Sequence, residues 1–220
     1  MRTTPATREF TDEEVPDERL HELLDVARFA PNGGNRQSWR IVVVRDPDTR
    51  RQVQHLYVLG DREYQAHTRV GLVAFAPGAD GVWHGPAVDL DAARDQHVEG
   101  ALAPTIATAP VLLAVFADLT ALACTDNGLG RQSIVGGASV YPFCHNVLLA
   151  ARDAGLGGVM TTVLARQEPA LRRLLGVPMP FAFAALLVLG HPMRTVTRLR
   201  RSDVADFATV DRFDGAPLRP

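Results

Sequence analysis

The side chains best suited to chemistry are gathered in one short stretch, residues 30–39, which reads APNGGNRQSW. It holds three amides, one guanidinium and one indole within ten positions. Asn and Gln side chains each present a donor and an acceptor on one rigid plane. Such a group of amides suits a flat heterocycle whose edge alternates N–H, C=O and bare nitrogen atoms.

A flavin ring has an edge of this kind, so the loop could line a flavin. The alternative is an ordinary polar turn, because Asn and Gly favour turns for purely local reasons. Taken alone, the loop favours the ordinary turn. The reading as a ligand site therefore depends on what the rest of the chain places beside it.

The segments on either side of the loop are predicted to be ordered. Residues 17–29 place four apolar side chains on one helical face, with Asp17 as the N-cap, and Pro31 ends the helix. Residues 40–44 then read as a strand that is buried on both faces. The amides are therefore expected on a helix-to-strand loop.

The remainder of the chain alternates strands with helices. Helices are predicted over 49–57, 91–99, 136–154 and 168–175, and further strands over 111–118, 157–164 and 181–189. Pro142 marks a kink or the first turn of the long helix, and Gly155 and Gly176 close helices. Residues 60–107 show a weak pattern and read as a lid or binding loop. These elements predict one layered α/β or α+β domain over residues 1–220, with helices on both faces of a sheet.

Composition narrows the classes of function. The net charge of −2 gives no basic field for nucleic acid, and no stretch is long and apolar enough to span a membrane, so a cytoplasmic location is expected. No histidines are spaced i, i+4 and the two cysteines form no C-x-x-C pair, so no metal site is expected. A P-loop and a dinucleotide-binding glycine motif are also absent.

Several motifs, in order along the chain, resemble the FMN-dependent nitroreductase family. They are REF and VP near the start, ARFAPNGGNRQSW around the amide loop, LLAARDAGLGG at the end of the long helix, LLGVP, and LVLGHP. Each motif is weak by itself, and together they cover nearly the whole chain. Two departures are Pro5-Ala6, where the family has Arg-Ser, and Ser38, which replaces a common Pro before Trp39.

The resemblance implies an α+β fold, a three-layer α/β/α sandwich with a central mixed sheet, in a homodimer with a domain-swapped C-terminal tail. FMN would sit at the dimer interface. The cofactor-binding residues implied are Arg8, Asn32, Asn35, Gln37, Met160, Thr161, Thr162, Arg198 and Arg200. Arg198 and Arg200 would also lie on one side of an extended segment, as a fork for phosphate, with Arg201 on the other side. Arg36 is a candidate for the charge at the flavin N1/O2 edge.

The implied activity needs no catalytic side chain, because the flavin carries the chemistry. Hydride would pass from NAD(P)H through flavin N5 to a small electron-poor acceptor, a nitroaromatic or a quinone, in a ping-pong cycle. Within the same fold, the protein could instead be a flavin-dependent dehydrogenase or a reductive dehalogenase of a small biosynthetic metabolite. From a different class, it could bind or sequester flavin with little turnover.

Overall fold

The computed structural model describes residues 1–220, which contain one four-stranded sheet. Its strands are β1 (Trp39–Val43), β2 (Val111–Asp118), β3 (Gly157–Thr161) and β4 (Phe181–Gly190), in the spatial order β1-β2-β4-β3. All three neighbouring pairs are antiparallel, whereas a mixed sheet was expected. The expectation of a mixed sheet is therefore wrong for the strands of a single chain.

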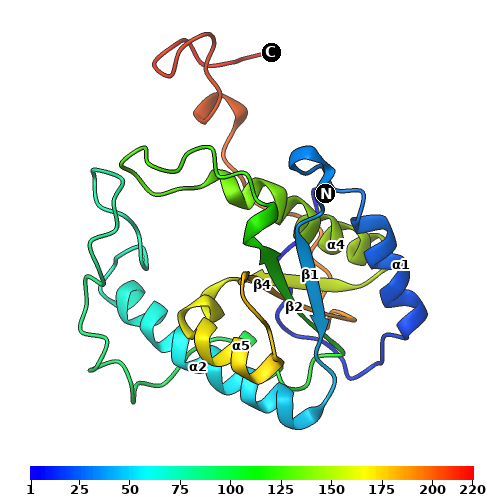
Figure 1. The fold of residues 1–220 in the computed structure, drawn as a ribbon. Helices are drawn as coiled ribbons and strands as arrows, with labels where there is room; N and C mark the ends of the chain where they lie inside the picture. Colours follow the sequence, from blue (N-terminus) through cyan, green and yellow to red (C-terminus); the bar gives the residue numbers. More distant parts are fainter.

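Helices cover both faces of the sheet (Figure 1). The helices α1 (Asp17–Ala27) and α4 (Tyr141–Asp153) pack on one face. The other face carries α2 (Pro47–Arg69), α3 (Leu102–Thr105) and α5 (Glu168–Leu175). The α+β fold class and the three-layer arrangement predicted from the sequence are therefore confirmed.

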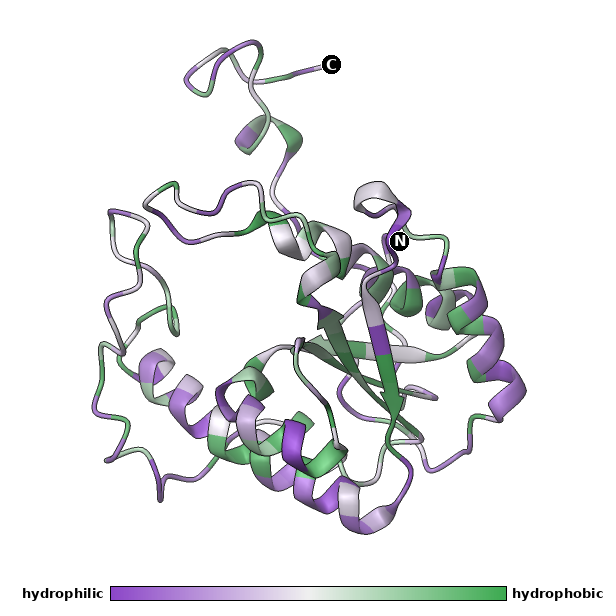
Figure 2. Ribbon diagram, viewed as in Figure 1, coloured by the Kyte–Doolittle hydropathy of each residue, from purple (hydrophilic) through white to green (hydrophobic).

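The central strands are apolar on both faces because both faces are covered. Val111, Leu113 and Val115 of β2 belong to the core under α1 and α4, while Leu112 and Phe116 belong to the core under α2 and α5. Figure 2 shows these strands mostly in hydrophobic green. A bulge between Val115 and Phe116 shifts the register against β4.

The helix predicted over 49–57 is much longer than expected. Asp46 caps it by accepting a 2.7 Å hydrogen bond from the backbone N–H of Thr49, and Pro47 occupies its first turn. The helix continues to Arg69. The prediction stopped short because the second half of the helix faces polar groups and lacks the apolar period on which a helix prediction depends. The predicted helix over 91–99 does not form. Asp89 instead accepts hydrogen bonds from the N–H groups of Asp91 and Ala92, which makes a turn.

The other element boundaries shift by smaller amounts. The segment predicted as helix over 136–154 starts as a 3₁₀ turn, Val135–Ser139, and α4 follows with Pro142 in its first turn. β3 stops at Thr161 and a second 3₁₀ segment, Val163–Gln167, replaces its predicted end. α5 ends at Gly176, whose φ of 65° is the left-handed C-cap that the glycine predicts.

The expected cap of α1 was wrong. Pro16 occupies the N-cap position without a side-chain hydrogen bond, and Asp17 begins the helix and pairs with Arg45. A carboxylate in the first helical turn still interacts favourably with the helix dipole.

Both ends of the chain pass over this body. The N-terminal arm is attached to β3 through the N–H of Thr7, which donates to the carbonyl of Gly158 at 2.9 Å, and a bridge joins Phe10 to Pro192. The tail after β4 runs away from the body (Figure 1) and leaves the rings of Phe207 and Phe213 exposed. No helix is both long enough and apolar enough to cross a membrane.

Candidate active site

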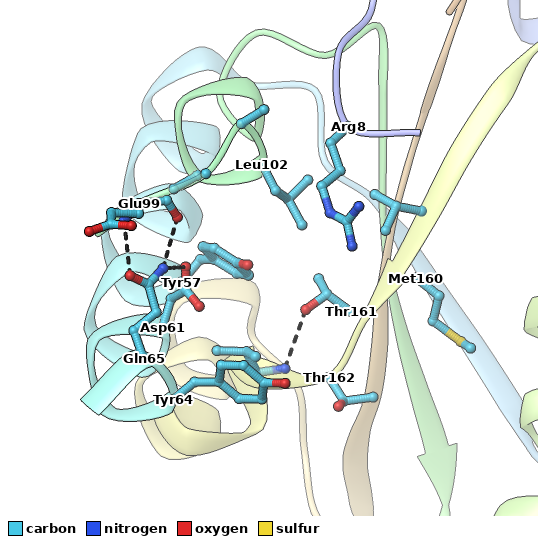
Figure 3. A pocket seen from close by; sticks show the side chains of 15 residues that line it. Arg8, Tyr57, Asp61, Tyr64, Gln65, Glu99, Leu102, Met160, Thr161 and Thr162 are labelled. Carbon is cyan, nitrogen blue, oxygen red and sulfur yellow. Dashed lines mark hydrogen bonds between the residues drawn. The ribbon is translucent and has the colours of Figure 1, made fainter. Parts of the chain in front are cut away.

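A cavity of about 350 Å³ lies between α2, β3 and the N-terminal arm, and is called the first cavity. Arg8 enters it from the arm, and Figure 3 shows its guanidinium pointing into the space between α2 and β3. Its remaining walls come from α2, from residues 99–103 and from the end of β3, including Tyr57, Asp61, Tyr64, Gln65, Glu99, Leu102, Met160, Thr161 and Thr162. The cavity thus joins segments that are far apart in the sequence.

One face of α2 supplies its polar wall. Tyr57, Asp61 and Gln65 are spaced four residues apart, which places them one above another on a helix. Gln65 donates to the Asp61 carboxylate at 3.1 Å and to the carbonyl of Glu99 at 2.8 Å, and accepts from the N–H of Glu99 at 2.9 Å. This amide therefore ties α2 to the loop above the cavity.

Asp61 is an acid without a cation partner. Its residue is only 7% exposed and Gln65 is its hydrogen-bond donor. Burial raises the pKa of this carboxyl, because the charged form loses its water. Burial, with a smaller contribution from Asp61, also raises the pKa of Tyr57 to about 12, so this phenol stays neutral. The α2 wall is therefore polar, with a neutral phenol at Tyr57 and a carboxyl at Asp61 whose pKa is raised.

The opposite wall is held close to α2 by a glycine. A Cβ at Gly60 would lie 2.8 Å from the carbonyl oxygen of Val163, so only glycine allows this approach. The N–H of Val163 in turn faces the hydroxyl of Thr161 at 3.4 Å. The backbone that follows β3 is thereby fixed at the mouth of the cavity.

A second cavity, of about 590 Å³, lies where the N-terminal arm and the tail cross α4. Three guanidiniums line it, those of Arg2, Arg198 and Arg201, together with His145 and with no carboxylate. The hydroxyl of Thr4, also in its wall, is buried without a hydrogen-bond partner. A buried orphan hydroxyl beside three guanidiniums is the donor set that an anion such as phosphate requires.

The structure gathers some of the sequence-predicted residues and separates others. Arg8, Met160, Thr161 and Thr162 meet in the first cavity, and Arg198 lines the second. Arg200 lines neither. Arg201, expected on the opposite side, lies with Arg198, because this segment pairs with no strand and is not held to the alternation of a pleat. The backbone carbonyl of Arg200 accepts from Arg201 at 2.6 Å.

The three amides lie elsewhere in the chain. No residue of 30–39 lines either cavity. Asn32 braces its own loop, accepting from the N–H of Gln37 at 2.9 Å and donating to Ala30, while Asn35 and Gln37 are exposed at φ of 53° and 48°. The loop is fixed to the start of α4 through Gly33, whose N–H donates to Ser139 at 3.1 Å.

The sequence analysis did not identify the polar residues of the α2 wall or part of the second cavity. The four-residue spacing of Tyr57, Asp61 and Gln65 would have indicated a shared helical face, but the helix was expected to end at residue 57. For the second, Arg2 and Thr4 carry no motif of their own. Only the meeting of the arm with the tail makes them neighbours of Arg198.

A family model described as the Nitroreductase family matches residues 2–191. The chain belongs to this family. Human iodotyrosine deiodinase 1 is 29% identical over 192 residues, which cover 87% of this chain and 60% of that protein. An NADH dehydrogenase of Thermus thermophilus is 32% identical over 188 residues, covering 84% and 81% of the two chains. The chain thus spans about 60% of the human deiodinase and most of the bacterial enzyme.

Solved structures agree with this assignment of the nitroreductase fold. A crystal structure of oxidized iodotyrosine deiodinase bound to FMN and 3-iodo-L-tyrosine superposes with a TM-score of 0.62 at 25% identity, covering 92% of each chain. In that neighbour the family fold holds FMN together with an aromatic ligand.

Proposed function

We propose that this protein is an FMN-dependent oxidoreductase that passes reducing equivalents from NAD(P)H to a small electron-poor acceptor, a nitroaromatic or a quinone. The observation that carries the proposal is the convergence of Arg8 with Met160, Thr161 and Thr162 on the first cavity. These four residues come from distant parts of the chain and are among the nine that the family motifs imply for FMN binding. The support from relatives is the FMN-bound structure of a deiodinase.

The residues present fit FMN at two places. The orphan hydroxyl of Thr4 and the guanidiniums of Arg198 and Arg201 would hold the phosphate, replacing the Arg-Ser that Pro5-Ala6 lacks. Arg8 and the backbone after β3 would hold the ring. Thr4 and Arg8 are four residues apart, which an extended chain spans in at most about 14 Å. One arm can therefore serve both ends of a mononucleotide.

When bound, FMN supplies two-electron chemistry at N5, accepting hydride from a nicotinamide and passing electrons to the acceptor in separate half-reactions. The chain's own contribution is position and charge. Arg8 brings a fixed positive charge to the ring cavity, where negative charge develops on reduction. On the α2 side the Tyr57 phenol stays neutral, and burial raises the pKa of the Asp61 carboxyl, which favours its uncharged form.

The complete site is proposed to need a second copy of the chain. The amides of Asn32, Asn35 and Gln37 line neither cavity, and we expect them to reach the ligand held by Arg8 of a partner chain. The tail exposes the apolar rings of Phe207 and Phe213, which are 71% and 103% accessible. Burying these rings on a partner chain would remove apolar surface from water. A homodimer in which the tail packs on the partner would account for both features.

The test is to release and identify the cofactor and then measure turnover. We expect FMN, and not FAD, on denaturation, and NADPH oxidation that rises when menadione or 4-nitrobenzyl alcohol is added. Release of FAD would defeat the cofactor assignment. Bound FMN without NADPH or NADH oxidation would instead indicate a flavin-sequestering protein. Light scattering that gives a flavin-loaded monomer would contradict the proposed dimer.

A second candidate is reductive removal of a ring halogen, which the similarity to iodotyrosine deiodinases favours. Chemical reduction of the purified protein followed by 3-iodo-L-tyrosine separates the two readings. Release of iodide from that substrate, with no consumption of nitroaromatics, would replace the first proposal by the second.

A further inference from the structure

Beside the first cavity lies another of about 390 Å³, which shares Tyr64, Thr162 and Val163 with it. Two further aromatic rings enclose it, Phe75 and Trp83 from the loop after α2. We call it the aromatic cavity. The rings of Tyr64 and Trp83 are 40% and 41% accessible, although large aromatic rings are usually buried in a core. Apolar ring faces held open around a cavity suit a planar aromatic ligand.

Phe75 has two ring contacts. The centroid of its ring lies 4.6 Å from that of His67, which is buried in the last turn of α2, and Cζ of the Arg166 guanidinium lies 4.6 Å from the Phe75 ring centroid. The backbone of Phe75 has a φ of 56°, a conformation that L side chains rarely adopt. A costly backbone geometry that survives because two contacts hold it indicates that this ring has a defined position.

Arg166 is the one cation in the wall of the aromatic cavity. It is paired from behind by Glu63 of α2, with Arg166 Nε donating to Glu63 Oε2 at 2.6 Å. Glu63 itself does not line the cavity, its side chain is 21% exposed, and its carboxylate has no hydrogen-bond partner other than Arg166. The carboxylate therefore neutralises a guanidinium that would otherwise attract an anion into the cavity.

The geometry points to Glu63 as a residue that determines specificity: by pairing with Arg166 it sets the aromatic cavity to take uncharged planar rings and to disfavour aryl carboxylates. This inference rests on the proposed function in taking the acceptor to be aromatic. It adds the charge that the acceptor carries and the pair of residues that select it. Without Glu63, Arg166 becomes a fork for a carboxylate at the rim of the cavity.

Two probes that share a ring and a nitro group isolate the charge: 4-nitrobenzyl alcohol and 4-nitrobenzoate. Their dissociation constants are measured by equilibrium dialysis against the oxidised, cofactor-loaded protein, so that no turnover is needed. We expect the alcohol to bind more tightly to the unaltered protein. Glu63→Gln should tighten 4-nitrobenzoate about tenfold, the value of one charge-assisted hydrogen bond at a partly exposed site, and change the alcohol less than twofold.

Three variants complete the design. Glu63→Gln combined with Arg166→Gln should lose the gain for 4-nitrobenzoate, and Trp83→Ala should weaken both probes about equally. Glu22→Gln is the matched control, because Glu22 pairs with Arg19 on the exposed face of α1. Tighter binding of 4-nitrobenzoate than of the alcohol by the unaltered protein would overturn the inference. So would equal effects of Glu63→Gln on both probes, or no effect of Trp83→Ala.

The dialysis result and the proposed function can fail separately. If the probes bind in the expected pattern but neither is reduced by NADPH, the proposed activity is wrong and the selective cavity stands. If 4-nitrobenzyl alcohol is reduced but its binding is insensitive to Trp83→Ala, the activity stands and the acceptor binds elsewhere.

Discussion

The N-terminal arm contributes to both cavities, Thr4 to the second and Arg8 to the first. The charged side chains in the two walls nevertheless differ. The second cavity has three guanidiniums and no carboxylate in its wall. The first sets one guanidinium, that of Arg8, against Asp61 and Glu99. In the proposed function, the anionic end of FMN would be held by clustered positive charge in the second cavity, and its flat ring by the wall of mixed charge in the first.

The largest effect is expected when positive charge is removed from the second cavity. Arg198→Ala and Arg201→Ala should each weaken FMN binding about tenfold, and the double variant about a hundredfold, because each loses a charge-assisted bond. Saturating FMN should restore turnover. The measurement is an FMN titration followed by NADPH oxidation.

Arg200→Ala is the matched control, with an expected change below twofold, because Arg200 lines neither cavity. Equal losses at positions 198, 200 and 201 would show that the basic segment acts only as diffuse surface charge.

A second variant addresses the first cavity. Arg8→Gln keeps a hydrogen-bond donor but removes the charge, so turnover should fall about five- to tenfold, roughly 1 to 1.4 kcal/mol of barrier. Excess FMN should not restore it. A loss that added FMN fully restores would place Arg8 among the phosphate-binding residues and remove the contrast between the two cavities.

The amide loop offers a third, smaller effect. Asn32→Ala removes the acceptor of the Gln37 N–H and a donor to Ala30, which should cost about 1 kcal/mol, or about 2–4 °C in the thermal midpoint. Asn35→Gly should leave the midpoint almost unchanged, since the Asn35 side chain makes no hydrogen bond within the chain and glycine tolerates the φ of 53° at this position. If both variants weaken FMN binding, the loop contacts the ligand of a partner subunit as proposed.

The smallest effect is expected at Asp61. Because burial raises the pKa of its carboxyl, the folded state holds its proton at pH values where the unfolded chain has released it, and stability falls as the pH rises through that interval. Asp61→Asn should therefore raise the thermal midpoint at pH 8 by about 2 °C, with the gain shrinking toward pH 4. The exposed Asp95→Asn is the control. A gain that does not depend on pH would mean that Asp61 is not desolvated.

The sequence predicted what depends on local pattern. Continuous apolar runs located β2 and β4 because both of their faces are buried, and Gly176 marked the end of α5. The end of α2 was missed for the opposite reason. Asp61 and Gln65 face a polar cavity, so the apolar period on which a helix prediction depends stops where the site begins.

The site was predictable only in so far as its residues carry motifs. Arg8 and Met160–Thr162, which the family motifs imply as FMN-binding, line one cavity, and their roles toward the cofactor stay predictions. Thr4 and Arg201 lie near each other only because the arm and the tail both cross α4, and no local property of either segment predicts that crossing. The roles assigned to Asn32, Asn35, Gln37 and Arg198 also stay predictions, and the Arg200→Ala variant tests the role that the family motifs imply for Arg200, which lines neither cavity.

The attachment of the arm to β3 affects how readily the protein aggregates. β3 is an edge strand, and an open edge offers unpaired backbone groups to other chains. The N–H of Thr7 occupies the carbonyl of Gly158, and Gly157 lets the arm lie close, since a Cβ there would be 2.7 Å from the Thr7 hydroxyl. The segment that carries Arg8 thus also covers this edge, and a ligand that holds the arm in place would protect the protein from aggregation through the β3 edge.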